Sequence, residues 1–203
     1  MASEAALRSL HGEGVVEFAL HPGGYIRFGD DFVLVATPRS PRGPLTVPFT
    51  GLHGAPLRPG DRAWIDDALH VGPHTIPLVP TPWPRPKLGA GWRAALDVIP
   101  RPSLLDAGNL TCLAGVGEGL TPVGDDILAG YTFVRGEHKG SGPLCSPLGL
   151  AYIRCAARGE LPEVVARVLE SPDAATARRR AKALSQWGSS SGAAMLWGVA
   201  SAM

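Results

Sequence analysis

Hydrophobic and polar positions change their spacing once along the chain, near residue 77. Before that point, short runs rich in β-branched and aromatic residues lie between turn-forming residues. This pattern is typical of β-strands joined by tight turns. The runs are residues 15–20, 25–28, 32–37, 45–49, 62–65 and 69–71. We predict a small sandwich or barrel from them, with Gly23-Gly24 and Gly29-Asp30-Asp31 as hairpin links.

Prolines mark the point where the spacing changes. Five of them occupy residues 77–86, PLVPTPWPRP, and such a run excludes a helix interior and favours a stiff, extended connector. We therefore predict three parts. They are a β-rich domain over 1–76, a proline-rich linker over 77–88 and a mainly helical domain over 89–203.

Apolar residues beyond the linker recur at the spacing of amphipathic helices. Helices are predicted over 125–134, 147–159, 161–170 and 172–187, and a short buried strand over 109–114. Residues 147–159 begin with proline and end with glycine, as helices commonly do. Arg178, Arg179 and Arg180 are interpreted as a solvated helix face. The fold class predicted from the whole pattern is α+β.

Composition narrows the classes of protein and partner. The chain has 203 residues, a net charge of +1 and 45% hydrophobic residues. These values suit a folded protein and give no overall field that would attract nucleic acid or an anionic membrane. No apolar run approaches a bilayer span, and no secretory leader is evident, so we expect a cytoplasmic protein. The three cysteines, which are widely spaced, are expected to be buried free thiols.

The segment most suggestive of chemistry is GVGEGLTPVGDDILAG, residues 115–130. Gly117 and Gly119 allow positive φ angles and a close approach of the backbone to a ligand. Thr121 and Pro122 are expected to be the N-cap and first residue of the following helix. Exposed N–H groups beside a helix N-terminus favour the binding of phosphate or carboxylate. The loop is therefore a candidate anion site.

Acidic residues complicate this interpretation. Glu118, Asp125 and Asp126 bring negative charge to the loop, and no lysine or arginine lies between residues 110 and 134. Mg²⁺ near Asp125 and Asp126 would resolve the conflict, because hard cations prefer oxygen ligands. Alternatively, the aspartates bind substrate N–H groups, or they only satisfy donors in the first helical turn. Gly130, one turn further on, predicts close packing against that face of the helix.

The run from Gly117 to Asp126, followed by Leu128-Ala129-Gly130, resembles the signature of a bacterial family first described as a domain of unknown function. That family is associated with one subunit of the oxamate carbamoyltransferase of allantoin breakdown. Within the run, Glu118 and Val123 stand where the family is expected to have proline and serine. Weaker similarity covers most of residues 110–200.

The resemblance implies that the chain binds a small anion, such as carbamoyl phosphate or oxamate, within a complex of carbamoyltransferase subunits. The residues it nominates for substrate binding are Gly117, Gly119, Thr121 and Gly124. We add Ser190 and Ser191, because the start of the last helix is expected to face the loop. Asp125 and Asp126 are the candidate catalytic residues. Two alternatives stay open: a non-catalytic binding or assembly subunit, and a metal-dependent phosphate-ester hydrolase.

The stretch Gly188-Ser189-Ser190-Ser191-Gly192 also fits the serine-hydrolase pattern, with Ser190 as nucleophile. Because a helix precedes it rather than a strand, we interpret Ser190 or Ser191 as the cap of the last helix. The family that this chain resembles is expected to have a histidine and then an aspartate at these positions. This chain has Ser189 and Ala194 instead. The resemblance therefore supplies no histidine for proton transfer.

Two further sets of residues have side chains of the types that bind ions. His70 and His74 are four residues apart, but Gly72-Pro73 lies between them in strand-like sequence. They are interpreted as surface histidines rather than metal ligands. Arg39 and Arg42 lie in a proline-rich loop, and they are candidates for the positive charge that residues 110–134 lack.

Overall fold

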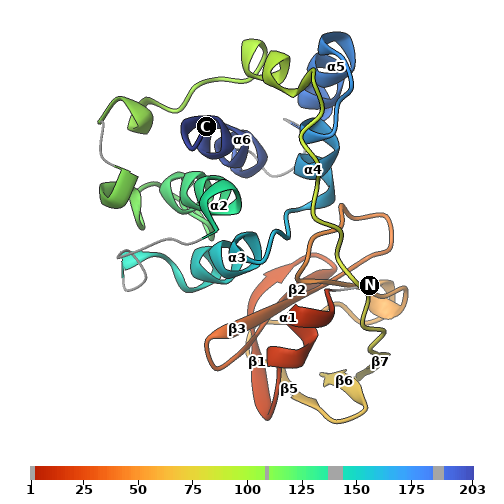
Figure 1. Ribbon diagram of the computed structural model, residues 1–203. Helices are drawn as coiled ribbons and strands as arrows, with labels where there is room; N and C mark the ends of the chain where they lie inside the picture. Colours follow the sequence, from red (N-terminus) through yellow and green to blue (C-terminus); the bar gives the residue numbers. More distant parts are fainter. Residues whose placement is uncertain (1–2, 108–109, 137–143, 185–189) are drawn as a thin grey trace. The chain divides into compact units, whose positions relative to one another are not determined.

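The computed structural model describes residues 3–107, 110–136, 144–184 and 190–203. The chain divides into two compact units, Met1–Trp83 and Pro84–Met203 (Figure 1). The first unit is built mainly of strands and the second of helices, which confirms the predicted α+β class.

The first unit is a single curled sheet of seven strands in the order β4-β3-β2-β1-β5-β6-β7 (Figure 1). All neighbouring strands are antiparallel except β3 and β4, which are parallel. The strands are β1 (Glu13–Leu20), β2 (Gly23–Phe28), β3 (Asp31–Ala36), β4 (Thr46–Pro48), β5 (Arg62–Ile65), β6 (Ala68–Val71) and β7 (His74–Pro77). Helix α1 (Glu4–Ser9) precedes them, and a 3₁₀ turn, η1 (Gly51–His53), follows β4.

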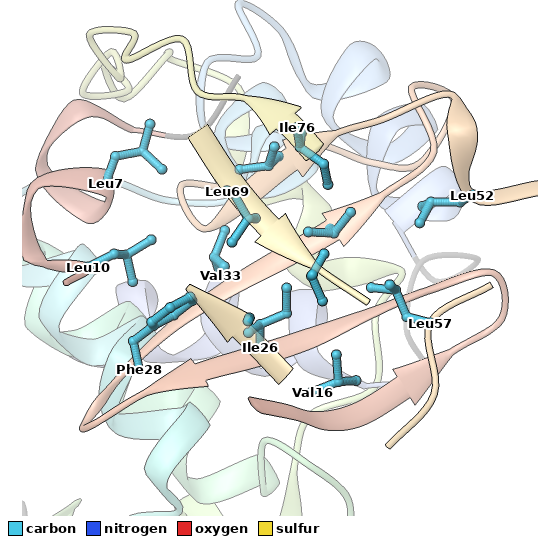
Figure 2. Packing of buried hydrophobic residues seen from close by; sticks show 14 residues of the cluster. Leu7, Leu10, Val16, Ile26, Phe28, Val33, Leu52, Leu57, Leu69 and Ile76 are labelled. Carbon is cyan, nitrogen blue, oxygen red and sulfur yellow. The ribbon is translucent and has the colours of Figure 1, made fainter. Parts of the chain in front are cut away.

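Bulky aliphatic and aromatic side chains form the core of this unit. Ile26, Val35 and Leu69 are completely buried in a cluster that Leu7 of α1 also joins, and Figure 2 shows its side chains gathered along the sheet. Burying each such side chain stabilises the fold by about 1.5–3 kcal/mol, because apolar surface leaves water. The β-branched and aromatic runs of the sequence thus supply the core of this unit.

Two elements of this unit were missed, and one expectation was wrong. Strand β7 was not predicted, because Pro73 precedes it, Pro77 is its last residue, and proline usually argues against a strand. Helix α1 has only six residues, too few for a periodic pattern. Gly23 and Gly24 are not a hairpin link but the first residues of β2. The link consists of His21 and Pro22, whereas Gly29-Asp30 does join β2 to β3 as expected.

The second unit contains five α-helices within its described residues. They are α2 (Val123–Arg135), α3 (Pro147–Ala157), α4 (Glu163–Leu169), α5 (Ala174–Leu184) and α6 (Ser191–Ser201). Three 3₁₀ turns come before them, η2 (Trp92–Asp97), η3 (Ser103–Ala107) and η4 (Leu110–Leu113). No helix in the described part of the chain is long and apolar enough to cross a bilayer.

Helices α2 and α6 pack closely because glycines face each other's backbone. A Cβ atom added to Gly130 of α2 would lie 1.9 Å from the Met195 carbonyl oxygen of α6. A Cβ atom added to Gly198 of α6 would lie 2.0 Å from the Ile127 carbonyl oxygen of α2. The expected close contact at Gly130 is therefore confirmed, and its partner is the last helix of the chain.

Several local predictions in this unit were wrong. Residues 110–113 form η4 rather than a buried strand. Thr121 is not an N-cap: α2 begins at Val123, with Pro122 in the cap position and no side-chain cap. Cys155 is buried as expected, but Cys112 is exposed and Cys145 is half-buried. Residues 185–187 of the predicted helix 172–187 lie outside the described part of the chain.

Candidate functional site

The glycine loop has the backbone conformation that its sequence predicts. Gly115, Gly117 and Gly119 have φ angles of 71°, 120° and 96°, a region that favours glycine. The loop is held to the start of α2 by a hydrogen bond from the Gly124 N–H to the Val116 carbonyl, at 2.9 Å. A side chain at Gly124 would lie 1.8 Å from the Leu113 carbonyl oxygen, so this close contact requires glycine.

The loop also presents unused backbone donors. Within the described residues, no acceptor is found for the backbone N–H groups of residues 117–121. Residues 117–120 are exposed and Thr121 is half-buried. A row of free N–H groups beside the start of a 13-residue helix attracts anions, because the helix dipole adds to it.

Asp125 is completely buried and joins the loop to another helix. Its Oδ1 accepts a hydrogen bond from the Gly115 N–H at 2.7 Å, and its Oδ2 accepts one from the Ser146 N–H at 2.8 Å. A Cβ atom at Gly149, in the first turn of α3, would lie 2.2 Å from Oδ2. Both carboxylate oxygens are thus engaged in holding the loop against the start of α3.

Ser146 completes this junction, although it is not among the residues predicted for the site. Its hydroxyl group donates to the Leu120 carbonyl at 3.1 Å and accepts from the Gly149 N–H at 3.0 Å. It is therefore the N-cap of α3 and a support of the loop at once. The sequence feature that could have identified Ser146 is its position directly before the proline that begins a predicted helix.

Asp126 points to a different set of partners. Its Oδ2 accepts a hydrogen bond from the Thr121 hydroxyl group at 3.3 Å, and that hydroxyl group lies 3.2 Å from the Ser191 hydroxyl group of α6. Its Oδ1 is buried and has no hydrogen-bond partner among the described residues. Such a group is costly to bury in its charged form.

Burial raises the pKa of Asp126 to about 8, and the negative charge of Asp125 adds to this effect. Hydrogen bonds from Ser191 and Thr121 act in the opposite direction but are weaker than the loss of solvation. At neutral pH the Asp126 carboxyl group is therefore mostly protonated and uncharged. A neutral carboxylic acid donates as well as accepts hydrogen bonds.

The two aspartates diverge, because neighbouring residues of a helix differ in direction by about 100°. Asp125 faces α3, and Asp126 faces Thr121 and α6. Both occupy the first turn of α2, so a single Mg²⁺ ion bridging them does not fit this arrangement. Among the described residues, the three groups close enough to share an ion are Asp66, Asp67 and His70, which belong to the sheet unit.

The start of α6 faces the loop, as expected. Ser191 lies against Thr121. Ser190 occupies the N-cap position, but its side chain makes no capping hydrogen bond. Gly188 and Ser189, the first half of the serine-hydrolase pattern, lie outside the described residues. The structure thus brings Thr121, Asp126 and Ser191 together.

The remaining candidate groups show ordinary surroundings. Burial raises the pKa of both Cys145 and Cys155 to about 12, so neither is a thiolate nucleophile at neutral pH. The ring of His70 stacks on Trp64 with centroids 4.7 Å apart and hydrogen-bonds to Asp66. His74 hydrogen-bonds to the Ala55 carbonyl.

Arg39 and Arg42 are exposed residues of the sheet unit. Their role as the source of positive charge for the glycine loop stays a prediction.

A comparison with protein families gives one match. The model of the oxamate carbamoyltransferase subunit AllH matches residues 142–203. This match supports an association of the chain with that family. It covers α3 to α6, whereas the glycine loop and the two aspartates lie outside the matched range. No curated protein and no solved structure matches the chain.

Proposed function

We propose that the chain is a subunit of an oxamate carbamoyltransferase-type complex and that its glycine loop binds a small anion such as carbamoyl phosphate or oxamate. The family match supports the first half of the proposal. The observation that carries the second half is the row of free, exposed N–H groups over residues 117–121. Backbone donors of this kind bind phosphate and carboxylate groups in many proteins.

The charge conflict in the sequence becomes smaller in this geometry. Asp126 is mostly uncharged at neutral pH because its pKa is raised to about 8. The Asp125 carboxylate is turned towards two N–H donors, which stabilise its charge. Glu118 is exposed to solvent, where water and salt screen its repulsion of an anion. An anion at residues 117–121 thus meets less negative charge than three acidic residues suggest.

The proposed role is binding rather than complete catalysis. A transferase reaction needs a group that moves protons, and the sequence has no histidine between His74 and His138. Asp126, as a neutral acid beside Thr121 and Ser191, is the group of the loop suited to hydrogen-bond an amide or carboxylate of the substrate. On this proposal, other subunits supply the missing positive charge and the remaining catalytic groups.

Calorimetric titration of the full chain with oxamate and with carbamoyl phosphate tests the anion site. Gly119→Pro removes one donor and the positive φ angle, and the space around Gly119 is open. We expect this variant to bind at least about tenfold more weakly, which is about 1.4 kcal/mol. Gly12→Pro is the matched control, because Gly12 is an exposed glycine with positive φ and open space in the sheet unit.

The two outcomes differ clearly. Weakened binding in Gly119→Pro, with wild-type affinity in Gly12→Pro, supports the anion site. If neither anion binds to the wild-type chain, the loop has an architectural role. The chain is then an assembly subunit without a ligand of its own at this loop.

A further inference from the structure

A cavity of about 440 Å³ lies within the helical unit, next to the glycine loop. One wall is the segment 99–104, and another is the first turn of α6, at Gly192, Ala193 and Ala194. Gly117 and Val123 close it towards the loop. Most of the lining residues are apolar, namely aliphatic residues, prolines and alanines.

The size of the cavity separates it from the proposed anion site. Pockets of roughly 300–1,000 Å³ hold ligands of drug size, with most of the ligand surface against apolar walls. Oxamate and carbamoyl phosphate are small, strongly hydrated anions, and an apolar cavity of this volume matches neither. The expected occupant has an apolar body that fills the space between segment 99–104 and α6.

The charges around the cavity indicate one anionic group on that ligand. Arg101 lies in the lining, and no acidic side chain is among the described residues that form it. The Arg101 guanidinium group is paired with Asp106 at 3.0 Å, but a guanidinium has five donors, so an ion pair on one side leaves others available. The first turn of α6 adds partial positive charge, because its N–H groups have no carbonyl partner within the helix.

We infer that this cavity binds an amphipathic carboxylate, with its apolar body against Leu104, Val123 and Ala194 and its carboxylate at Arg101. The site shares Gly117 with the glycine loop, but it does not rest on the proposed function. Its ligand differs from carbamoyl phosphate and oxamate in size and in polarity. Separate titrations therefore test the two proposals.

Titration of the full chain with octanoate, followed by calorimetry, tests the inference. Octanol provides the apolar body without the charge, and acetate provides the charge without the body. We expect octanoate to bind, octanol to bind about tenfold more weakly because a charge-assisted hydrogen bond is missing, and acetate not to bind. Arg101→Gln should reduce the affinity for octanoate to that for octanol and leave octanol binding unchanged.

Substitutions that fill the cavity locate the binding. Ala193→Phe places a ring in the lining, and we expect it to weaken octanoate binding at least about tenfold. Ala200→Phe is the matched control, since Ala200 is a half-buried alanine of the same helix outside the lining. Ser103→Phe fills the cavity from an exposed position on the other wall, so it provides the test if Ala193→Phe does not fold.

Three results would overturn the inference. The first is an absence of octanoate binding to the folded wild-type chain. The second is unchanged affinity in the folded cavity-filling variants, which would place the binding elsewhere. The third is equal affinity for octanoate and octanol, which would remove the role of Arg101.

Discussion

The sheet unit and the helical unit are stabilised in opposite ways. In the sheet unit, large side chains such as Ile26 and Leu69 fill the inner face of the sheet. In the helical unit, α2 and α6 meet through Gly130 and Gly198, where side chains are absent. The helical unit also buries two carboxyl groups next to this contact, whereas the sheet unit keeps its acidic residues outside its core. Buried polar groups are costly, so the helical unit is where function is expected.

The largest effect is expected where the helices meet. Gly130→Ala would force its Cβ atom against the Met195 carbonyl, and two backbones cannot separate without loss of packing. We expect a loss of about 3 kcal/mol in the free energy of unfolding. In the sheet unit, a Cβ atom at Gly54 would lie 3.8 Å from the Gly51 carbonyl oxygen, an ordinary contact, so Gly54→Ala should change the free energy of unfolding by less than about 0.5 kcal/mol. Chemical denaturation measures both, and similar losses in the two variants would contradict the comparison.

The next effect concerns Asp125. Asp125→Asn replaces one acceptor oxygen by an amide group, which cannot accept the hydrogen bond from Gly115 or Ser146. We expect a loss of about 2 kcal/mol, because the amide N–H group at this completely buried position and the backbone N–H group that faces it are both left without a partner. Asp97→Asn is the control, since that exposed ion pair with Arg178 contributes at most about 1 kcal/mol. If urea denaturation shows a larger loss of stability in Asp97→Asn than in Asp125→Asn, the hydrogen bonds of Asp125 do not stabilise the fold as proposed.

Asp126 should make stability depend on pH. The pKa of its carboxyl group is raised from 3.8 to about 8 on folding, so the folded state holds a proton that the unfolded state has released. The stabilisation is complete below pH 3.8 and is lost as pH rises to about 8. Between these values the free energy of unfolding falls as pH rises. Asp126→Asn lacks this contribution. If the free energy of unfolding of the wild-type chain and of Asp126→Asn depends on pH in the same way, Asp126 is not the source of the pH dependence.

The smallest effect is expected at Ser191. Its hydroxyl group hydrogen-bonds to Asp126 and thereby lowers that group's pKa. Ser191→Ala should cost about 1 kcal/mol and shift the alkaline loss of stability to higher pH. Ser201→Ala, an exposed serine of the same helix, should leave the pH profile unchanged. An identical profile in Ser191→Ala would show that this hydroxyl group does not interact with Asp126.

Local patterns predicted the elements of both units better than the roles of individual residues. Runs of β-branched and aromatic residues between turn-forming residues identified the strands around Ile26 and Leu69. Strand β7 could not be predicted in this way. A strand tolerates prolines only at the edge of a sheet, and the tertiary fold decides which strand lies at the edge. The positive φ angles of Gly117 and Gly119 followed from residue type alone.

The roles of the two aspartates depended on distant partners. Asp125 accepts from Ser146, 21 residues away, and Thr121 meets Ser191, 70 residues away. No local pattern specifies which side of α2 each acid faces. Their different environments, one acid held by N–H donors and the other desolvated, therefore required the three-dimensional structure.

The central claim is that the free N–H groups of residues 117–121 bind a small anion. Backbone amide chemical shifts of the ¹⁵N-labelled chain, followed by NMR during titration with oxamate and then with carbamoyl phosphate, test this directly. We predict saturable shifts that are largest for Gly117, Gly119 and Thr121, and weaker shifts in Gly119→Pro. Saturable shifts that leave residues 117–121 unchanged, or no shifts with either anion, would contradict the claim.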